Sequence, residues 1–221
     1  MSQIVDHPRI ATPRLTGPQA VVIVAAPAVA VLARLLTTPW YQDENRPDDA
    51  RVLTEIAGAA GRNQVGAVLA LLSAVLFAIA AIVVAQIVRA RSPRVAWAGV
   101  VLAGFGAFGL TLFAAFVGVI TIMAGLDDRE AMLELMTRLN DSAVAGVSFL
   151  VLVLGAVGWL VLGYGLYRAA AIPRAAAVFS AIGGAGVMLT TTGPAISFIA
   201  GSAVLCLIGF AWIALAAQRR S

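Results

Sequence analysis

Residues 64–88, QVGAVLALLSAVLFAIAAIVVAQIV, contain no Asp, Glu, Lys, Arg or His. A helix crosses the hydrocarbon core of a bilayer with about 20 apolar residues. Exposure of so many apolar side chains to water would be unfavourable. This stretch therefore predicts a transmembrane helix. The fold class of the whole chain follows from it, because similar stretches occur on both sides.

Apolar runs divide the chain into six predicted spans, at about residues 19–38, 64–88, 95–124, 143–167, 174–191 and 195–217. Of the 221 residues, 61% are hydrophobic and 12% charged, whereas soluble domains carry about 25% charged residues. We expect an all-α fold, a polytopic transmembrane helix bundle that forms one transmembrane domain over residues 1–221. The net charge of +4 comes from scattered arginines without a continuous stripe, which argues against nucleic-acid binding.

The junction of the fifth and sixth runs and the nature of the first run each leave an alternative. The fifth and sixth runs meet at Thr190–Pro194, where Gly193-Pro194 favours a tight outer turn, and a broken helix is the alternative. The first run follows Arg9 and Arg14 as a signal peptide would. Arg34 interrupts it, however, and no small-x-small cleavage site follows, so we expect a retained span.

The charges predict an orientation. One side of a six-span topology receives arginines almost alone: Arg9, Arg14, Arg89, Arg91, Arg94, Arg168, Arg174, Arg219 and Arg220. The other side receives all but one of the acidic residues: Asp43, Glu44, Asp48, Asp49, Glu55, Asp127, Asp128, Glu130, Glu134 and Asp141. The positive-inside rule then places both termini in the cytoplasm. We expect a multi-pass protein of the plasma (inner) membrane. Basic residues that are all Arg and abundant Ala indicate a high-GC genome.

The two acidic loops resemble each other. Asp48, Asp49 and Glu55 align at one fixed offset with Asp127, Asp128 and Glu134, which suggests repeat units 19–94 and 95–174. Apolar residues at helical spacing in each loop predict two short amphipathic outer helices, on the outer face of the bundle or at the lipid boundary. Duplication would relate the two units by an axis along the membrane normal.

Two residues of the first span are candidate functional residues. Arg34 is the only ionisable residue well inside a span, and a membrane charge is a functional-site hypothesis by default. Snorkelling to the headgroups or pairing with an acidic loop is the favoured explanation, and contact with a ligand or substrate is the alternative. Pro27, midway along the same run, is expected to kink the helix and free a carbonyl. Gating and a static kink both remain open.

Other site chemistry is not indicated. Spans two to six contain no Asp, Glu, Lys, Arg or His, so their serines have no His or Lys partner within the membrane. We therefore expect no enzyme, no catalytic residue, no cofactor and no metal. The acidic loops lack a calcium-loop pattern, and their charges are expected to cap helices.

Small residues recur at every fourth position and predict close helix packing within the chain, or a homo-oligomer. The ridges comprise Gly66, Ala70, Ala74 and Ala78; Gly99, Ala103 and Ala107; Ala176, Ser180 and Gly184; and Ser197 and Gly201.

Six spans, amphipathic outer segments and Arg/Pro inner turns at Arg89–Arg94 and Arg168–Arg174 resemble a group of small polytopic bacterial integral membrane proteins of unknown function. This resemblance implies no catalytic residue. Our first hypothesis is a non-enzymatic protein that sits in the lipid bilayer and binds a membrane protein partner or a lipid. The alternative is a carrier or channel for a small neutral or apolar solute, with Arg34 and Pro27 near its pathway. A polar cavity reaching the middle of the membrane would favour the carrier, and a solid core would favour binding.

Overall fold

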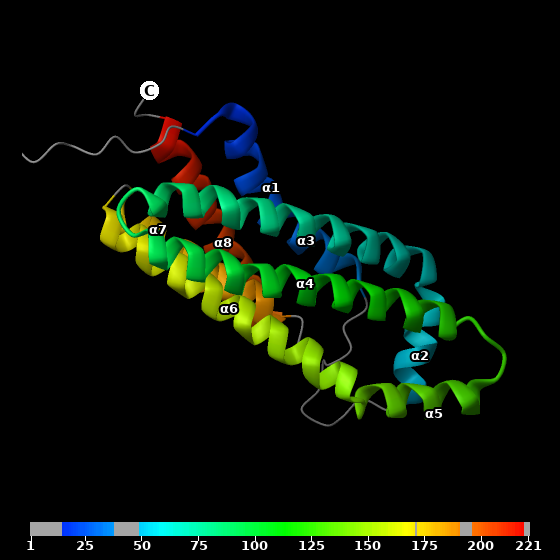
Figure 1. Ribbon diagram of the computed structural model, residues 1–221. Helices are drawn as coiled ribbons and strands as arrows, with labels where there is room; N and C mark the ends of the chain where they lie inside the picture. Colours follow the sequence, from blue (N-terminus) through cyan, green and yellow to red (C-terminus); the bar gives the residue numbers. More distant parts are fainter. Residues whose placement is uncertain (1–14, 38–48, 171, 191–195, 219–221) are drawn as a thin grey trace, which may run out of the picture.

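The computed structural model describes residues 15–37, 49–170, 172–190 and 196–218, and within these ranges every regular element is a helix (Figure 1). The predicted all-α bundle with six apolar helices and two short ones is confirmed. The helices are α1 (Gly17–Leu36), α2 (Asp49–Gly58), α3 (Ala60–Arg89), α4 (Pro93–Met123), α5 (Arg129–Asn140), α6 (Ala143–Ala169), α7 (Arg174–Leu189) and α8 (Ile196–Gln218).

The six apolar helices form a ring in chain order. Each one packs against the next, and α8 returns to pack against α1 through the smallest of these interfaces. Helices α3 and α6 also touch each other across the centre. Pro93 in the first turn of α4 and Pro173 just before α7 start these helices where a missing N–H costs nothing.

Helix lengths divide the molecule into a membrane part and a projecting part. Five helices are long and apolar enough to cross a membrane, and α7 is apolar but has 16 residues. Helices α3 and α4 have 30 and 31 residues, which at 1.5 Å per residue is about 45 Å. A hydrocarbon core of about 30 Å leaves part of both helices outside it.

Glycines mark the closest approaches between neighbouring helices. A Cβ atom built on Gly106 of α4 would lie 2.7 Å from the Cα of Gly155 on α6, and one on Gly109 would lie 2.9 Å from the Leu152 side chain. Such approach increases dispersion contacts, the main attraction available inside lipid. The predicted close packing of small residues within the chain is confirmed at the buried positions Gly66, Ala70, Ala74, Gly99, Ala103, Ala107, Ala176, Ser180 and Gly184.

The same contacts give the helix directions. Gly183 of α7 faces Cys206 of α8, and Gly209 of α8 faces Ser180 of α7, so these two helices run antiparallel. The chain therefore reverses between Leu189 and Ile196, as the tight-turn prediction requires. Residues 191–195 themselves lie outside the described residues.

Helices α2 and α5 pack over the ends of α3 and α4 (Figure 1). Leu53 and Ile56 of α2 and Met136 of α5 are buried in one apolar cluster with Val117 and Ile120 of α4. We call this cluster with α2 and α5 the α2–α5 cap. The predicted amphipathic helix α2 thus buries its apolar stripe against the bundle, whereas α5 buries Met136 and leaves Leu135 exposed.

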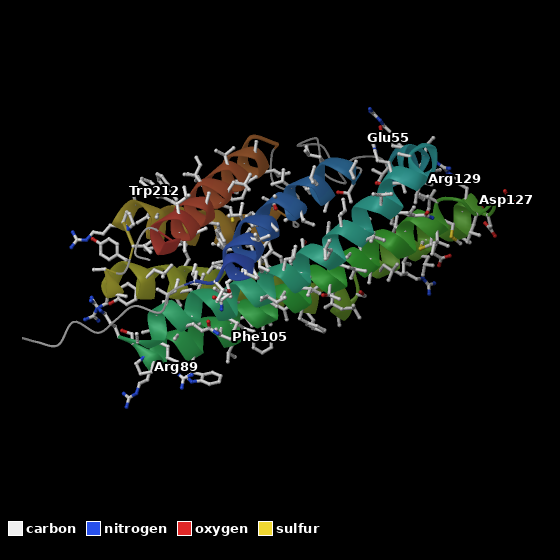
Figure 2. All side chains as sticks on the ribbon, turned by 90° about the horizontal axis from the view of Figure 1, so that it is seen from above. Glu55, Arg89, Phe105, Asp127, Arg129 and Trp212 are labelled. Carbon is white, nitrogen blue, oxygen red and sulfur yellow. The ribbon has the colours of Figure 1, made fainter. Side chains whose placement is uncertain are left out.

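Among the described residues, one end of the bundle carries arginines without carboxylates, and the carboxylates lie at the other end. Figure 2 shows Arg89 at one end and Glu55, Asp127 and Arg129 at the other. All described arginines of the turns after α3 and α6 lie at the first end, which we call the arginine end: Arg89, Arg91, Arg94, Arg168 and Arg174. The acidic side chains with described positions belong to the α2–α5 end. Residues Trp40, Tyr41, Asp43 and Glu44 and both arginine-bearing termini lie outside the described residues.

The arginine end also carries exposed aromatic rings, as at a headgroup boundary. The guanidinium carbons of Arg168 and Arg174 lie 5.9 and 5.3 Å from the ring centres of Tyr164 and Tyr167. Trp97 is exposed near the start of α4. If this end is level with the headgroups, the extra length of α3 and α4 projects at the α2–α5 end.

The order of elements repeats once. Helices α1, α2 and α3 form a long, a short and a long element, and α4, α5 and α6 do the same. Glu55 and Glu134, which align in sequence, each form an exposed ion pair within their own helix, with Arg51 and Arg138. The duplication stays a prediction, because any chain that crosses repeatedly gives parallel alternate helices.

Candidate functional site

Arg34 lies in the last turn of α1, towards the α2–α5 end. At the arginine end, the Gln19 amide of α1 donates to the Gln86 amide oxygen of α3 at 3.4 Å. Arg34 is about 15 residues further along α1, or roughly 22 Å at 1.5 Å per residue. If the Gln19–Gln86 pair marks one boundary of a core about 30 Å thick, Arg34 lies in the third of that core nearest the α2–α5 end.

The guanidinium of Arg34 is only partly satisfied. Its Nη1 donates to the Thr37 hydroxyl at 3.3 Å, and this hydroxyl donates to the Arg34 carbonyl at 3.1 Å. The Nε atom is buried and has no hydrogen-bond partner among the described residues. A buried donor without a partner loses its hydration, which costs about 1–3 kcal/mol or more for a charged group.

Arg34 lines a small cavity of about 30 Å³ between α1, α3, α4 and α7. Ser73 of α3 and Thr190 after α7 supply further polar atoms. Their hydroxyls donate to the carbonyls of Ala70 and Val187, at 2.8 and 2.7 Å. The remaining walls are apolar: Ala30, Ala33, Leu110, Phe113 and the side chain of Val187.

Three aromatic rings fill the centre of the bundle between this cavity and the arginine end. Phe77 lies one helical turn beyond Ser73 along α3. Its ring centre is 5.7 Å from that of Trp159 and 6.2 Å from that of Phe210, and Trp159 and Phe210 are 5.1 Å apart. We call these three residues the aromatic plug. All three are almost fully buried.

Trp159 carries a second unsatisfied group. Its indole N–H is buried without a hydrogen-bond partner among the described residues. A Cβ atom on Gly184 would lie 2.9 Å from the indole ring, so α7 closely covers it. The ring is held by packing alone, and this N–H has no assigned role.

Pro27 lies in the middle of α1, two turns before Arg34, and is buried. It cannot donate to the carbonyl of Ile23, which loses its intrahelical partner. The helix is nevertheless continuous through it. Arg34 and Pro27 therefore share a helix, but Arg34 lines the cavity and Pro27 is not among its described lining residues. Whether either residue is functional stays a prediction.

Other sequence candidates gain no partners for chemistry within the described ranges. Ser148 and Ser180 donate to carbonyls of their own helices, those of Val144 and Ala177. No three described His, Cys, Asp or Glu side chains converge as a metal site would require. Cys206 is a buried free thiol, and His7 lies outside the described residues.

Sequence reasoning missed the polar residues that line the cavity together with Arg34. Ser73 and Thr190 are ordinary membrane hydroxyls in the sequence, and nothing marks them as neighbours of α1. Trp159 carried a weak signal, since it is an aromatic residue away from the ends of its span. Arg129 carried none, although its Nη2 donates to the Ala50 carbonyl at 2.6 Å and to the Thr54 hydroxyl and so joins α5 to α2.

One family model matches this chain, over residues 20–217, and it is described as a domain of unknown function, DUF4386. No curated protein and no solved structure matches the chain. The predicted resemblance to small polytopic membrane proteins of unknown function is confirmed.

Proposed function

The chain belongs to the DUF4386 family, whose description gives no activity, and from the geometry of its bundle we propose that it is a non-enzymatic membrane protein that works by binding. The binding half is the α2–α5 end, where the cap and the Arg34 cavity lie together. Its ligand or partner is another component of the membrane, a lipid or a membrane protein.

The observation that carries this proposal is the aromatic plug. Phe77, Trp159 and Phe210 occupy the axis of the ring on the inner side of the cavity. A solute that entered beside Arg34 would meet these rings before it reached the arginine end. Glycine contacts such as Gly106 with Gly155 bring the surrounding helices together at the same depth. A dead-end cavity suits binding better than passage.

Two features of the described residues support the non-enzymatic part of the proposal: the hydrogen bonds of the hydroxyls and the positions of the charges. The hydroxyls of Ser73, Ser148 and Ser180 donate to backbone carbonyls of their own helices, and not to a catalytic base. A nucleophile needs a neighbouring base, and no described His, Lys or carboxylate lines this cavity.

We propose the cytoplasmic side for the arginine end, on the positive-inside rule. Cysteine labelling tests this orientation, because the natural Cys206 is fully buried. A membrane-impermeant maleimide is expected to label Asp127→Cys in intact cells and Arg94→Cys only after lysis. The opposite pattern would reverse the orientation.

Photo-crosslinking in native membranes tests binding at the cap. A photoreactive amino acid at Leu135 of α5 is compared with one at Phe105 of α4, since these side chains are 41% and 43% exposed. Phe105 points away from the bundle at mid-length (Figure 2). We expect a discrete adduct from Leu135 and only diffuse lipid adducts from Phe105. Equal, diffuse products from both sites would contradict binding at the cap.

Solute flux tests the alternative of a carrier for a small neutral solute. Vesicles with the reconstituted protein are expected to leak glycerol and urea no faster than protein-free vesicles. A protein-dependent flux that Arg34→Ala abolishes would establish the carrier and overturn the binding proposal.

A further inference from the structure

The cavity beside Arg34 contains a positive charge with no acidic partner among the described residues. Arginine remains protonated in proteins, and none of the described residues that line the cavity is acidic. Arg34 is half-buried and its Nε atom is fully buried, so the lack of a counter-charge there is unfavourable. Thr37 supplies only one neutral acceptor, at 3.3 Å. The cavity therefore has a strong preference for a negatively charged occupant.

The guanidinium edge formed by Nε and Nη2 indicates which kind of anion fits the cavity. Thr37 engages Nη1, while Nε is buried and has no described partner. Nε and Nη2 lie on the same edge of the planar group, opposite the Thr37 contact. Two parallel N–H bonds from one edge match two oxygens of a carboxylate or a phosphate.

The size and depth of the cavity limit what can enter. A water-sized group needs about 10–15 Å³ of such volume, so about 30 Å³ accepts roughly two of them. That is enough for the two oxygens of one oxyanion and too little for a whole organic molecule. By the same length estimate Arg34 lies roughly 8 Å below the headgroups at the α2–α5 end, and apolar walls such as Leu110 and Phe113 suit the carbon atoms that follow an oxyanion head.

We propose that this cavity binds one oxyanion, a carboxylate or a phosphate, held by the Nε and Nη2 atoms of Arg34. The oxyanion is the head of a lipid or a free anion, and its depth favours the lipid. This proposal rests on the proposed binding function and names the chemistry of its ligand. It gives Arg34 a ligand-binding role and leaves Pro27 outside the site.

The test uses the full-length protein in a neutral detergent and three separate probes. Oleate supplies a carboxylate, phosphatidylglycerol a lipid phosphate, and sodium phosphate the free anion. Titration calorimetry measures affinity, and native mass spectrometry counts the bound lipid. We expect one oleate or phosphatidylglycerol per chain. Binding of sodium phosphate alone, with the same dependence on Arg34, would keep the oxyanion site and identify a free anion as its source.

Arg34→Ala is expected to weaken binding by about 10- to 100-fold, the effect of losing charged hydrogen bonds. Arg34→Lys keeps the charge but cannot present two parallel donors, so its loss is expected to be intermediate. Arg94→Ala is the matched control, because it removes the same charge from an exposed site at the arginine end. Unchanged affinity in Arg34→Ala, equal losses in Arg34→Ala and Arg94→Ala, or no binding of any probe would overturn the proposal.

A further variant covers the case in which Arg34→Ala does not fold. Ser73→Val keeps Arg34, replaces the Ser73 hydroxyl by a methyl group and adds a second methyl group at the wall of the cavity, so it is expected to weaken binding by at least several-fold while the protein stays monodisperse. Wild-type affinity in this variant would argue against the cavity as the binding site. Crosslinking from Leu135 is independent of both variants, so a failure here leaves the proposed function standing.

Discussion

Substitution of Gly155 by alanine tests how closely α4 and α6 pack. A Cβ atom at Gly155 would overlap the Cα of Gly106 and lie 2.8 Å from its nitrogen. These atoms belong to the backbone, so no rotation of a side chain can relieve the overlap. The contact with the Gly106 Cα is the closer of the two, so the helices would have to separate by more than about 1 Å to reach the shortest ordinary contact of 3.4 Å.

This separation has a cost that can be estimated. Overpacking by a methyl group costs about 1–3 kcal/mol, and separating the helices also weakens the dispersion contacts along both. Alanine regains at most about 1 kcal/mol of helix propensity over glycine. We expect Gly155→Ala to lower the free energy of unfolding by about 1–2 kcal/mol.

The assay is unfolding of the purified protein in mild detergent with increasing dodecyl sulfate, followed by circular dichroism. Gly146→Ala is the matched control on the same helix, because a Cβ there would meet no atom within 4 Å. The control is expected to be unchanged or slightly more stable. Equal stability of the two variants would refute the close approach of α4 and α6 at this position.

Three further predictions concern the turn after α6, the aromatic plug and the cap. Ala170 has a φ of 48°, so Ala170→Gly is expected to raise stability by about 1 kcal/mol, and a lower melting temperature would contradict this. Trp159→Ala is expected to cost about 3–5 kcal/mol. Trp159→Phe should stay within about 1 kcal/mol of wild type, because it removes a buried N–H that has no described partner; equal losses in both variants would show that the N–H is satisfied. Leu53→Ala, at a site 1% exposed, is expected to speed hydrogen exchange in α2 while the bundle melts nearly as before. A matching fall in the melting of the bundle would mean that cap and bundle unfold together.

Much of the fold was predictable from the sequence because its causes are local. A run such as residues 64–88 is excluded from water whatever its neighbours are, and its length matches a bilayer. Proline at Pro93 and Pro173 begins helices for reasons of backbone geometry. Arg34 was identifiable for the same reason, since a charge inside an apolar run is costly wherever the helix packs.

The arrangement of the helices was not predictable in this way. Inside lipid, an apolar side chain is equally suited to face a tail or another helix, so hydropathy does not tell which face of a span is buried. The sequence therefore could not show that Phe77, Trp159 and Phe210 meet at the axis. The ridges of small residues indicated close packing, but the pairing of Gly106 with Gly155 needed the structure.

Residence in a membrane, the confinement of nearly all carboxylates to one end, and the unusual position of Arg34 could all be derived from the sequence. The surroundings of Arg34 became known only from the packing of the helices. Ser73 and Thr190 come from helices far apart in the sequence, and Thr37 takes one edge of the guanidinium and leaves the other without a described partner. The physical reason is that transfer from water to lipid depends on each segment alone, whereas a binding site depends on which segments are brought together.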